Sequence, residues 1–187
     1  MPEFVNGMTL YHGSYCTVEK PDLNKCAKYK DFGQGFYLTT SKEQAQNFIR
    51  ISLKKAISQN LVSTDCNFGY VTVFTLNLKE SLNYYEFTDT DASWLHCVVG
   101  HRKCGSFDSV VKKMSVYDVI SGKIANDQTN ATIATYMDGI FGPMGTDNAD
   151  RVCISLLLPE RLQNQFCFRT QKSINCLSFK ESEKICL

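Results

Sequence analysis

The chain has 187 residues, which is enough for one ordinary domain with a real core and short for two. Hydrophobic residues make up 43% and charged residues 21%, and this globular composition excludes a disordered chain. The formal net charge is +1, which gives no reason to expect strong non-specific binding to nucleic acid or to an anionic membrane.

The N-terminal residues 1–8 are not expected to form a secretory signal, because they have neither a basic region nor an apolar stretch. The longest apolar runs, such as residues 154–159, are far shorter than the roughly 18–20 residues that cross a bilayer. We therefore expect a cytoplasmic protein that forms a single domain over residues 1–187 and does not contact a membrane.

The nine cysteines are scattered and never form a Cys-x-x-Cys pair. In a reducing cytosol this predicts nine free thiols, most of them buried as small hydrophobic residues. Cys97, His101 and Cys104 lie at helical spacing, but along one helix they extend over about 10 Å and cannot share one ion. We expect no metal site.

In the front half of the chain, aromatic and β-branched runs indicate strands, and apolar positions at helical spacing indicate one helix. Ser41 is the expected N-cap of that helix, whose apolar residues fall at 45, 48, 49, 53, 56 and 57. A polar, lysine-rich loop over 15–34 separates the first two strands. The expected strands are 8–11, 35–39, 69–78 and, near the last of these, 84–87.

The back half is expected to contain three helices and three strands. Asp89 or Thr90 is the expected N-cap of the first helix, and Leu95, Val98, Val99 and Arg102 lie on one side of it. A Gly-Pro-rich stretch over 139–146 separates the other two helices. The expected helices are 89–102, 127–138 and 150–157, and the expected strands are 116–120, 165–169 and 174–179. The fold class is α+β.

Two short motifs carry residues suited to binding a flat ring. His12 and Gly13 end the first strand, and a glycine there lets the backbone approach a neighbour closely. Tyr37 lies in the second strand, and Phe48 follows eleven residues later on the next helix. Aromatic rings on a strand and an adjoining helix can enclose a planar group. Taken alone, each of these residues is more often explained by a structural role.

Taken together and in order, the motifs Leu-Tyr-His-Gly-Ser (10–14) and Phe-Gly-Gln-Gly-Phe-Tyr-Leu-Thr (32–39) closely resemble the NAD-binding half of the ADP-ribosyltransferases. This is the class of diphtheria toxin and the poly-ADP-ribose polymerases. The segments 117–127 and 165–179 resemble a mostly bacterial branch of that superfamily, labelled as a domain of unknown function. The resemblance covers about residues 8–180. It implies two small bent β-sheets packed at an angle, flanking helices and an NAD cleft between the sheets.

The resemblance also implies roles for individual residues. His12 would hold the adenosine-side ribose of NAD, and the Gly13 backbone, next to Ser14, would bind the nicotinamide carboxamide. Tyr37 and Phe48 would stack on the two faces of the nicotinamide. The late-strand residue that acts on the ribose or the nucleophile would be Gln165, so the implied catalytic residues are Gln165, His12 and Tyr37.

Two positions depart from the family pattern. Gln165 stands where the family usually has glutamate, and an amide can hydrogen-bond a hydroxyl but cannot act as a carboxylate base. This argues against the elongation of poly-ADP-ribose chains. Ala45 stands where polymerases carry a serine that bonds the carboxamide, and a core position on the helix explains it equally well.

The implied activity is transfer of one ADP-ribose from NAD to a macromolecular acceptor, a protein or a nucleic acid, with release of nicotinamide. The alternatives are NAD hydrolysis without an acceptor and a non-catalytic interaction domain, and an antitoxin-like protein is a further partner to consider. Outside the motifs, Asp118, Asn126 and Asp127 are weaker candidates for contacting the acceptor, since such residues at strand ends more often cap turns. The lysines between 20 and 30 would cover NAD, bind a polyanion, or simply be solvated.

Overall fold

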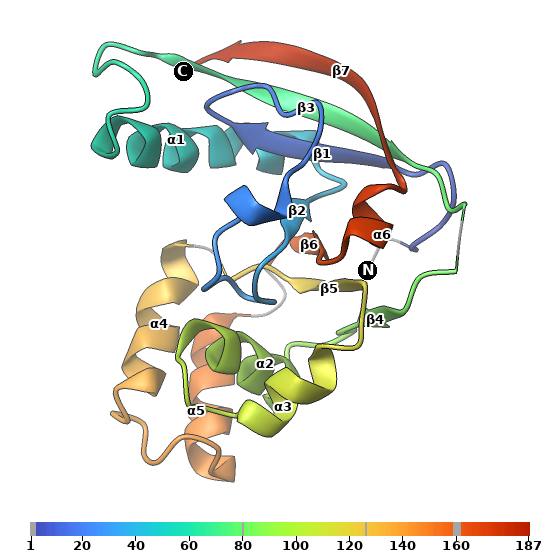
Figure 1. Cartoon of the computed structure of the whole chain (residues 1–187). Helices are drawn as coiled ribbons and strands as arrows, with labels where there is room; N and C mark the ends of the chain where they lie inside the picture. Colours follow the sequence, from blue (N-terminus) through green and yellow to red (C-terminus); the bar gives the residue numbers. More distant parts are fainter. Residues whose placement is uncertain (1–2, 80, 126, 159–161) are drawn as a thin grey trace.

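The structure is a computed structural model, and it describes residues 3–79, 81–125, 127–158 and 162–187. It is an α+β fold with two sheets, one of three strands and one of four, as expected for the class (Figure 1). None of the helices in these ranges is long and apolar enough to cross a membrane.

The three-stranded sheet is antiparallel and contains both the first and the last strand of the chain. Its order is β1–β3–β7, with β1 at Thr9–Ser14, β3 at Phe68–Leu76 and β7 at Leu177–Cys186. Helix α1 (Lys42–Ser58) packs against β1 and β3 through Ala45 and Ile49 (Figure 1). Ser41 caps this helix as predicted, since its side chain accepts a hydrogen bond of 3.1 Å from the Gln44 N–H.

The four-stranded sheet has the order β2–β6–β5–β4, with β4 parallel to β5 and the other pairs antiparallel. Its two central strands, β5 and β6, are almost entirely buried, because both faces of the sheet are covered. The four strands are β2 (Phe36–Leu38), β4 (Tyr84–Glu86), β5 (Val119–Lys123) and β6 (Asn164–Phe168).

The strand period of two separates the two main apolar clusters. Phe36, Leu38, Phe166 and Phe168 form one side, where they join Leu10, Phe74 and Leu76 of the other sheet in a cluster between the sheets. The intervening residues, Tyr37 and Cys167, pair across β2 and β6 and face a cluster contributed mainly by helices. This alternation fixes which face of the sheet carries each candidate site residue.

Four helices cover the second face of the four-stranded sheet (Figure 1). Trp94 and Tyr136 are fully buried among them, and the Trp94 indole N–H donates to the Lys123 carbonyl at 3.1 Å. The four are α2 (Ala92–Arg102), α3 (Asp108–Met114), α4 (Asp127–Met137) and α5 (Asp147–Leu157). The turn η1 (Leu23–Lys25) and the short helix α6 (Gln171–Ile174) complete the described elements.

Several predicted boundaries were wrong for local reasons. The N-cap of α2 is Asp91, not Asp89 or Thr90, because the Asp91 carboxylate accepts from the Trp94 N–H at 3.0 Å. Helix α5 begins earlier than residue 150, after the N-cap Thr146, and β5 continues past 120 to Lys123. Helix α3 was not predicted.

The end of the chain also differs from the expectation. The strand predicted at 174–179 begins instead at Leu177 and continues to Cys186. The residues before it form α6, because Thr170 and Ser173 make a reciprocal capping box that starts a helical turn.

The cysteines are all free, as predicted, but they are not mostly buried. Only Cys97, Cys153, Cys167 and Cys176 are buried. Cys16, Cys26 and Cys66 are partly exposed, and Cys104 and Cys186 are exposed.

Candidate functional site

A cleft of about 990 Å³ opens between the two sheets, beside α1 and the lysine-rich loop. Its volume lies at the upper end of the range of roughly 300–1,000 Å³ that is usual for ligand sites. The residues predicted for the site all border this one cleft, although they come from four separate elements or loops. They are His12, Gly13, Ser14, Tyr37, Phe48 and Gln165.

The cleft begins where β1 and β2 separate. The two strands are joined at one bridge, in which Tyr11 and Thr39 exchange backbone hydrogen bonds of 2.8 and 3.0 Å. Backbone groups two residues apart in a strand point to the same edge, so the N–H and C=O of Gly13 are turned toward the edge that β2 has left. One residue thereby presents a donor and an acceptor side by side to the cleft.

Gly13 has a packing reason to be glycine as well. A Cβ atom placed there would lie 1.8 Å from the Ala45 carbonyl oxygen, because β1 passes directly against the start of α1. Ala45 itself is buried, which agrees with the core position expected for it. The neighbouring Ser14 is buried too, and its hydroxyl lies 3.5 Å from the Ser52 hydroxyl on α1.

His12 is held by one hydrogen bond that determines its tautomer. Its Nδ1 lies 2.9 Å from the Tyr37 carbonyl oxygen, and because a carbonyl only accepts, Nδ1 carries the proton. Burial lowers the pKa of His12, and the bond to Tyr37 offsets this only in part. The ring is therefore neutral near pH 7, and its Nε2 is a hydrogen-bond acceptor.

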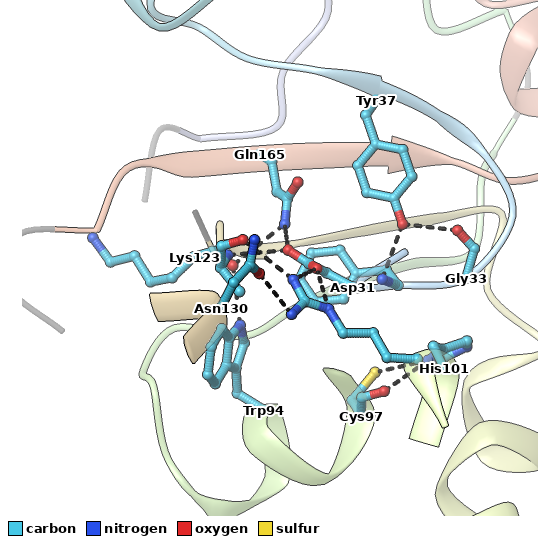
Figure 2. Close-up of polar contacts among 12 residues, drawn as sticks. Asp31, Gly33, Tyr37, Trp94, Cys97, His101, Lys123, Asn130 and Gln165 are labelled. Carbon is cyan, nitrogen blue, oxygen red and sulfur yellow. Dashed lines mark hydrogen bonds and ion pairs between the residues drawn. The ribbon is translucent and has the colours of Figure 1, made fainter. Parts of the chain in front are cut away.

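Tyr37 is fixed at both ends, by its strand and by its hydroxyl. The hydroxyl donates to the Gly33 carbonyl at 2.8 Å and accepts from the Phe32 N–H at 2.9 Å (Figure 2). Burial raises the pKa of Tyr37 well above its ordinary value, so the phenol stays neutral. Phe48 contributes a second, partly buried ring from α1, and the Lys30 ammonium lies 5.9 Å from its centroid.

Gln165 lies on the same face of the four-stranded sheet as Tyr37, two residues along β6 from Cys167, with which Tyr37 pairs. It is only 5% exposed. Its amide nitrogen donates to the Asp31 carboxylate at 2.7 Å and lies 3.4 Å from the Lys123 carbonyl (Figure 2). The cleft thus contains a buried carboxylate close to the position where the resemblance implies one.

Sequence reasoning missed Asp31 and its partner Arg102, and both border the cleft. The Arg102 Nε donates to Asp31 at 3.0 Å, and one of its terminal nitrogens donates to Asn130 at 2.9 Å. A usable signal was present, because Arg102 lies on the same helical side as Leu95 and Val98. A charged residue on a buried helical face requires an opposite charge.

The weaker candidates are distributed differently. Asp118 is a structural anchor, because its carboxylate accepts from the Asn83 N–H at 2.9 Å and from the Thr170 hydroxyl at 2.7 Å. Asn126 lies outside the described residues, and Asp127 is described only as the first residue of α4. Of the lysines between 20 and 30, Lys20, Lys25 and Lys30 border the cleft.

Cys97, His101 and Cys104, which lie at helical spacing in the sequence, have separate local environments. The His101 Nδ1 lies 2.8 Å from the Cys97 carbonyl oxygen and 3.6 Å from its sulfur, while Cys104 is exposed. Burial raises the pKa of Cys97 to about 12, so its thiol is protonated.

The chain belongs to the family described as "Protein of unknown function (DUF3990)", which matches residues 8–179. The match includes the whole cleft as described above, from His12 to Gln165. Neither a curated protein nor a solved structure matches the chain.

Proposed function

We propose that the chain has the ADP-ribosyltransferase fold, binds NAD in the cleft and transfers a single ADP-ribose to a macromolecular acceptor. The observation that carries the proposal is the convergence of the motif residues on one cleft of suitable size. The order of these residues along the sequence does not by itself require them to meet in space.

The chemistry of the lining supports NAD as the ligand. A carboxamide needs an acceptor for its N–H and a donor for its oxygen, and the free backbone edge at Gly13 offers both. Tyr37 and Phe48 offer aromatic faces for the nicotinamide ring. The neutral His12 offers an acceptor nitrogen to a ribose hydroxyl.

Release of nicotinamide breaks a glycosidic bond and passes through an oxocarbenium-like transition state. Gln165 cannot remove a proton or supply a negative charge, but its amide oxygen can accept a hydrogen bond from a ribose hydroxyl and orient the ring. We therefore assign Gln165 the role of orienting the ribose. This suits transfer of one unit and does not suit chain elongation.

The test is release of nicotinamide from NAD, measured with and without cell extract as a source of acceptor. A transferase releases nicotinamide faster with extract and labels a macromolecule with ADP-ribose. Tyr37→Ala should reduce the release, while Tyr117→Ala, which removes a partly exposed tyrosine from the helical cluster, should leave it unchanged.

Two other results point to the alternatives. Equal release with and without extract, and no labelled product, indicates an NAD glycohydrolase. NAD binding without release of nicotinamide indicates an interaction domain. The observation that favours this alternative is the amide of Gln165, which stands where the usual catalytic carboxylate is missing. Absence of both binding and release contradicts the proposal.

A further inference from the structure

Three segments distant in sequence meet around the carboxylate of Asp31 at the base of the cleft. One oxygen accepts from Arg102 at the end of α2, and the other accepts from the Ala125 N–H at 3.0 Å and the Gln165 amide at 2.7 Å. Asp31 is 5% exposed, so these donors replace the water that a carboxylate normally binds.

The charges in this group are balanced one to one. Arg102 is the cationic partner, and two further N–H groups of its guanidinium donate to the Asn130 side chain at 2.9 Å and the Ala125 carbonyl at 3.2 Å. Lys123 lies on the adjacent strand β5, but its ammonium donates to the Leu162 carbonyl at 2.9 Å and is not a partner of Asp31 among the described contacts. An additional, uncompensated charge next to a buried ion pair of this kind would strongly destabilise the folded state.

The Asp31 carboxylate at 2.7 Å is the nearer of two acceptors that determine which way the Gln165 amide is turned, the other being the Lys123 carbonyl at 3.4 Å. A carboxylate is only an acceptor, so it selects the NH₂ end of the amide. Figure 2 shows the Gln165 nitrogen directed at Asp31 and its oxygen directed away from it. Without such a partner, the two ends of an amide are nearly equal in shape and either can face a ligand.

We propose that Asp31, held by Arg102, is a positioning residue that fixes the Gln165 amide so that its oxygen is offered to the ligand. This inference rests on the proposed function, in which that oxygen accepts from a ribose hydroxyl.

The proposal predicts that Gln165→Glu, which installs the glutamate usual in the family, impairs the site at neutral pH. Installing the usual glutamate would place a second carboxylate about 2.7 Å from Asp31, where both cannot be ionised, so the pKa of the introduced carboxyl must rise. In its protonated form the introduced side chain has the shape of glutamine, and its O–H can donate to Asp31 as the amide does. The variant should therefore work when this carboxyl is protonated and fail when it is ionised.

The experiment compares the wild type, Gln165→Glu and the double variant Asp31→Asn/Gln165→Glu, which again has a single carboxylate in this group. Nicotinamide release by Gln165→Glu should approach the wild-type rate at acid pH and fall about tenfold per pH unit above the raised pKa. NAD affinity should change much less than turnover. The double variant should not show this loss.

Stability gives a second readout that does not depend on activity. In the unfolded chain the introduced glutamate ionises near its ordinary pKa of about 4.3, but in the folded variant it stays protonated to higher pH. The unfolded state therefore binds fewer protons between these values, and the unfolding equilibrium constant of Gln165→Glu should rise by about tenfold per pH unit relative to wild type. The double variant should lack this trend in urea titrations.

The outcomes are distinguishable. If Gln165→Glu is as stable and as active as wild type at all pH values, or if the double variant behaves like the single one, the positioning role is overturned. A wild type that neither binds NAD nor releases nicotinamide contradicts the proposed function instead, while the urea titrations still decide whether Asp31 determines the state of residue 165. Gln165→Glu keeps the shape of glutamine, so its own pH dependence remains decisive, and the double variant is compared only where its urea titration shows a cooperative unfolding transition.

Discussion

At the scale of single residues, hydrogen bonds decide which atoms of the cleft face a ligand. The Tyr37 carbonyl keeps the proton on His12 Nδ1, and Asp31 keeps the Gln165 amide oxygen turned outward. In both cases the partner group can only accept a hydrogen bond, whereas the His12 and Gln165 side chains can each donate and accept. The partner therefore fixes the tautomer of His12 and the orientation of the Gln165 amide. The cleft therefore presents acceptors from both residues, which suits the hydroxyl groups of ribose.

The neutral state of His12 makes a pH-dependent prediction. Its pKa is lowered by burial, so the folded protein keeps His12 unprotonated at pH values where a free histidine, with a pKa of about 6.5, takes up a proton. NAD affinity should therefore stay constant as the pH falls from about 8 to 6.5, and decrease only at lower pH where the folded pKa is crossed. Calorimetric titrations across this range measure it.

The same residue should affect stability with a defined sign. A folded pKa below the unfolded one means that stability is lost as the pH falls below about 6.5, because the unfolded state binds the additional proton. His12→Gln should lack this part of the pH dependence. For the binding prediction, an NAD affinity that already halves near pH 6.5 would show that the pKa of His12 is not lowered. That result would contradict the neutral state assigned to its ring.

At the scale of elements, local patterns predicted the longer helices and strands better than their ends. The α1 pattern was strong because its apolar residues repeat over several turns and Ser41 provides a cap. Helix α3 escaped prediction because it has only 7 residues and begins after Phe107, whose φ of 51° needs tertiary contacts to be stable. Of the site, the sequence motifs predicted both partners of the His12–Tyr37 contact, but of the contact between Gln165 and Asp31 only Gln165. Asp31 was missed because its role depends on residues 71 and 134 positions away.

The start of α2 can be tested directly. Asp91→Ala removes the cap that accepts from the Trp94 N–H, and the loss should destabilise the protein by about 1 kcal/mol. Asp89→Ala is the matched control, because Asp89 precedes the helix and its carboxylate accepts only from the exposed Thr88 hydroxyl among the contacts described. Urea unfolding measures both variants, and equal effects would contradict the assignment of Asp91 as the cap.

At the scale of the whole molecule, the sheets and the cleft depend on pairings between distant segments. The strand β7 joins β3 across a long stretch of the chain, and β6 lies between β2 and β5, which precede it by many residues. Periodicity predicts that such strands exist, but it does not determine their neighbours. The two-sheet arrangement followed instead from the family resemblance, and the α+β class and the two sheets agree with it.

The central claim is that one cleft between the sheets binds NAD through the motif residues. Calorimetric titration of NAD into the wild type, the double variant His12→Ala/Tyr37→Ala and the control Tyr117→Ala tests it most directly, with unfolding curves to show that each variant is folded. The account predicts saturable binding by the wild type and the control and none by the folded double variant. Absence of binding by the wild type at millimolar NAD, or equal binding by the double variant, would contradict it.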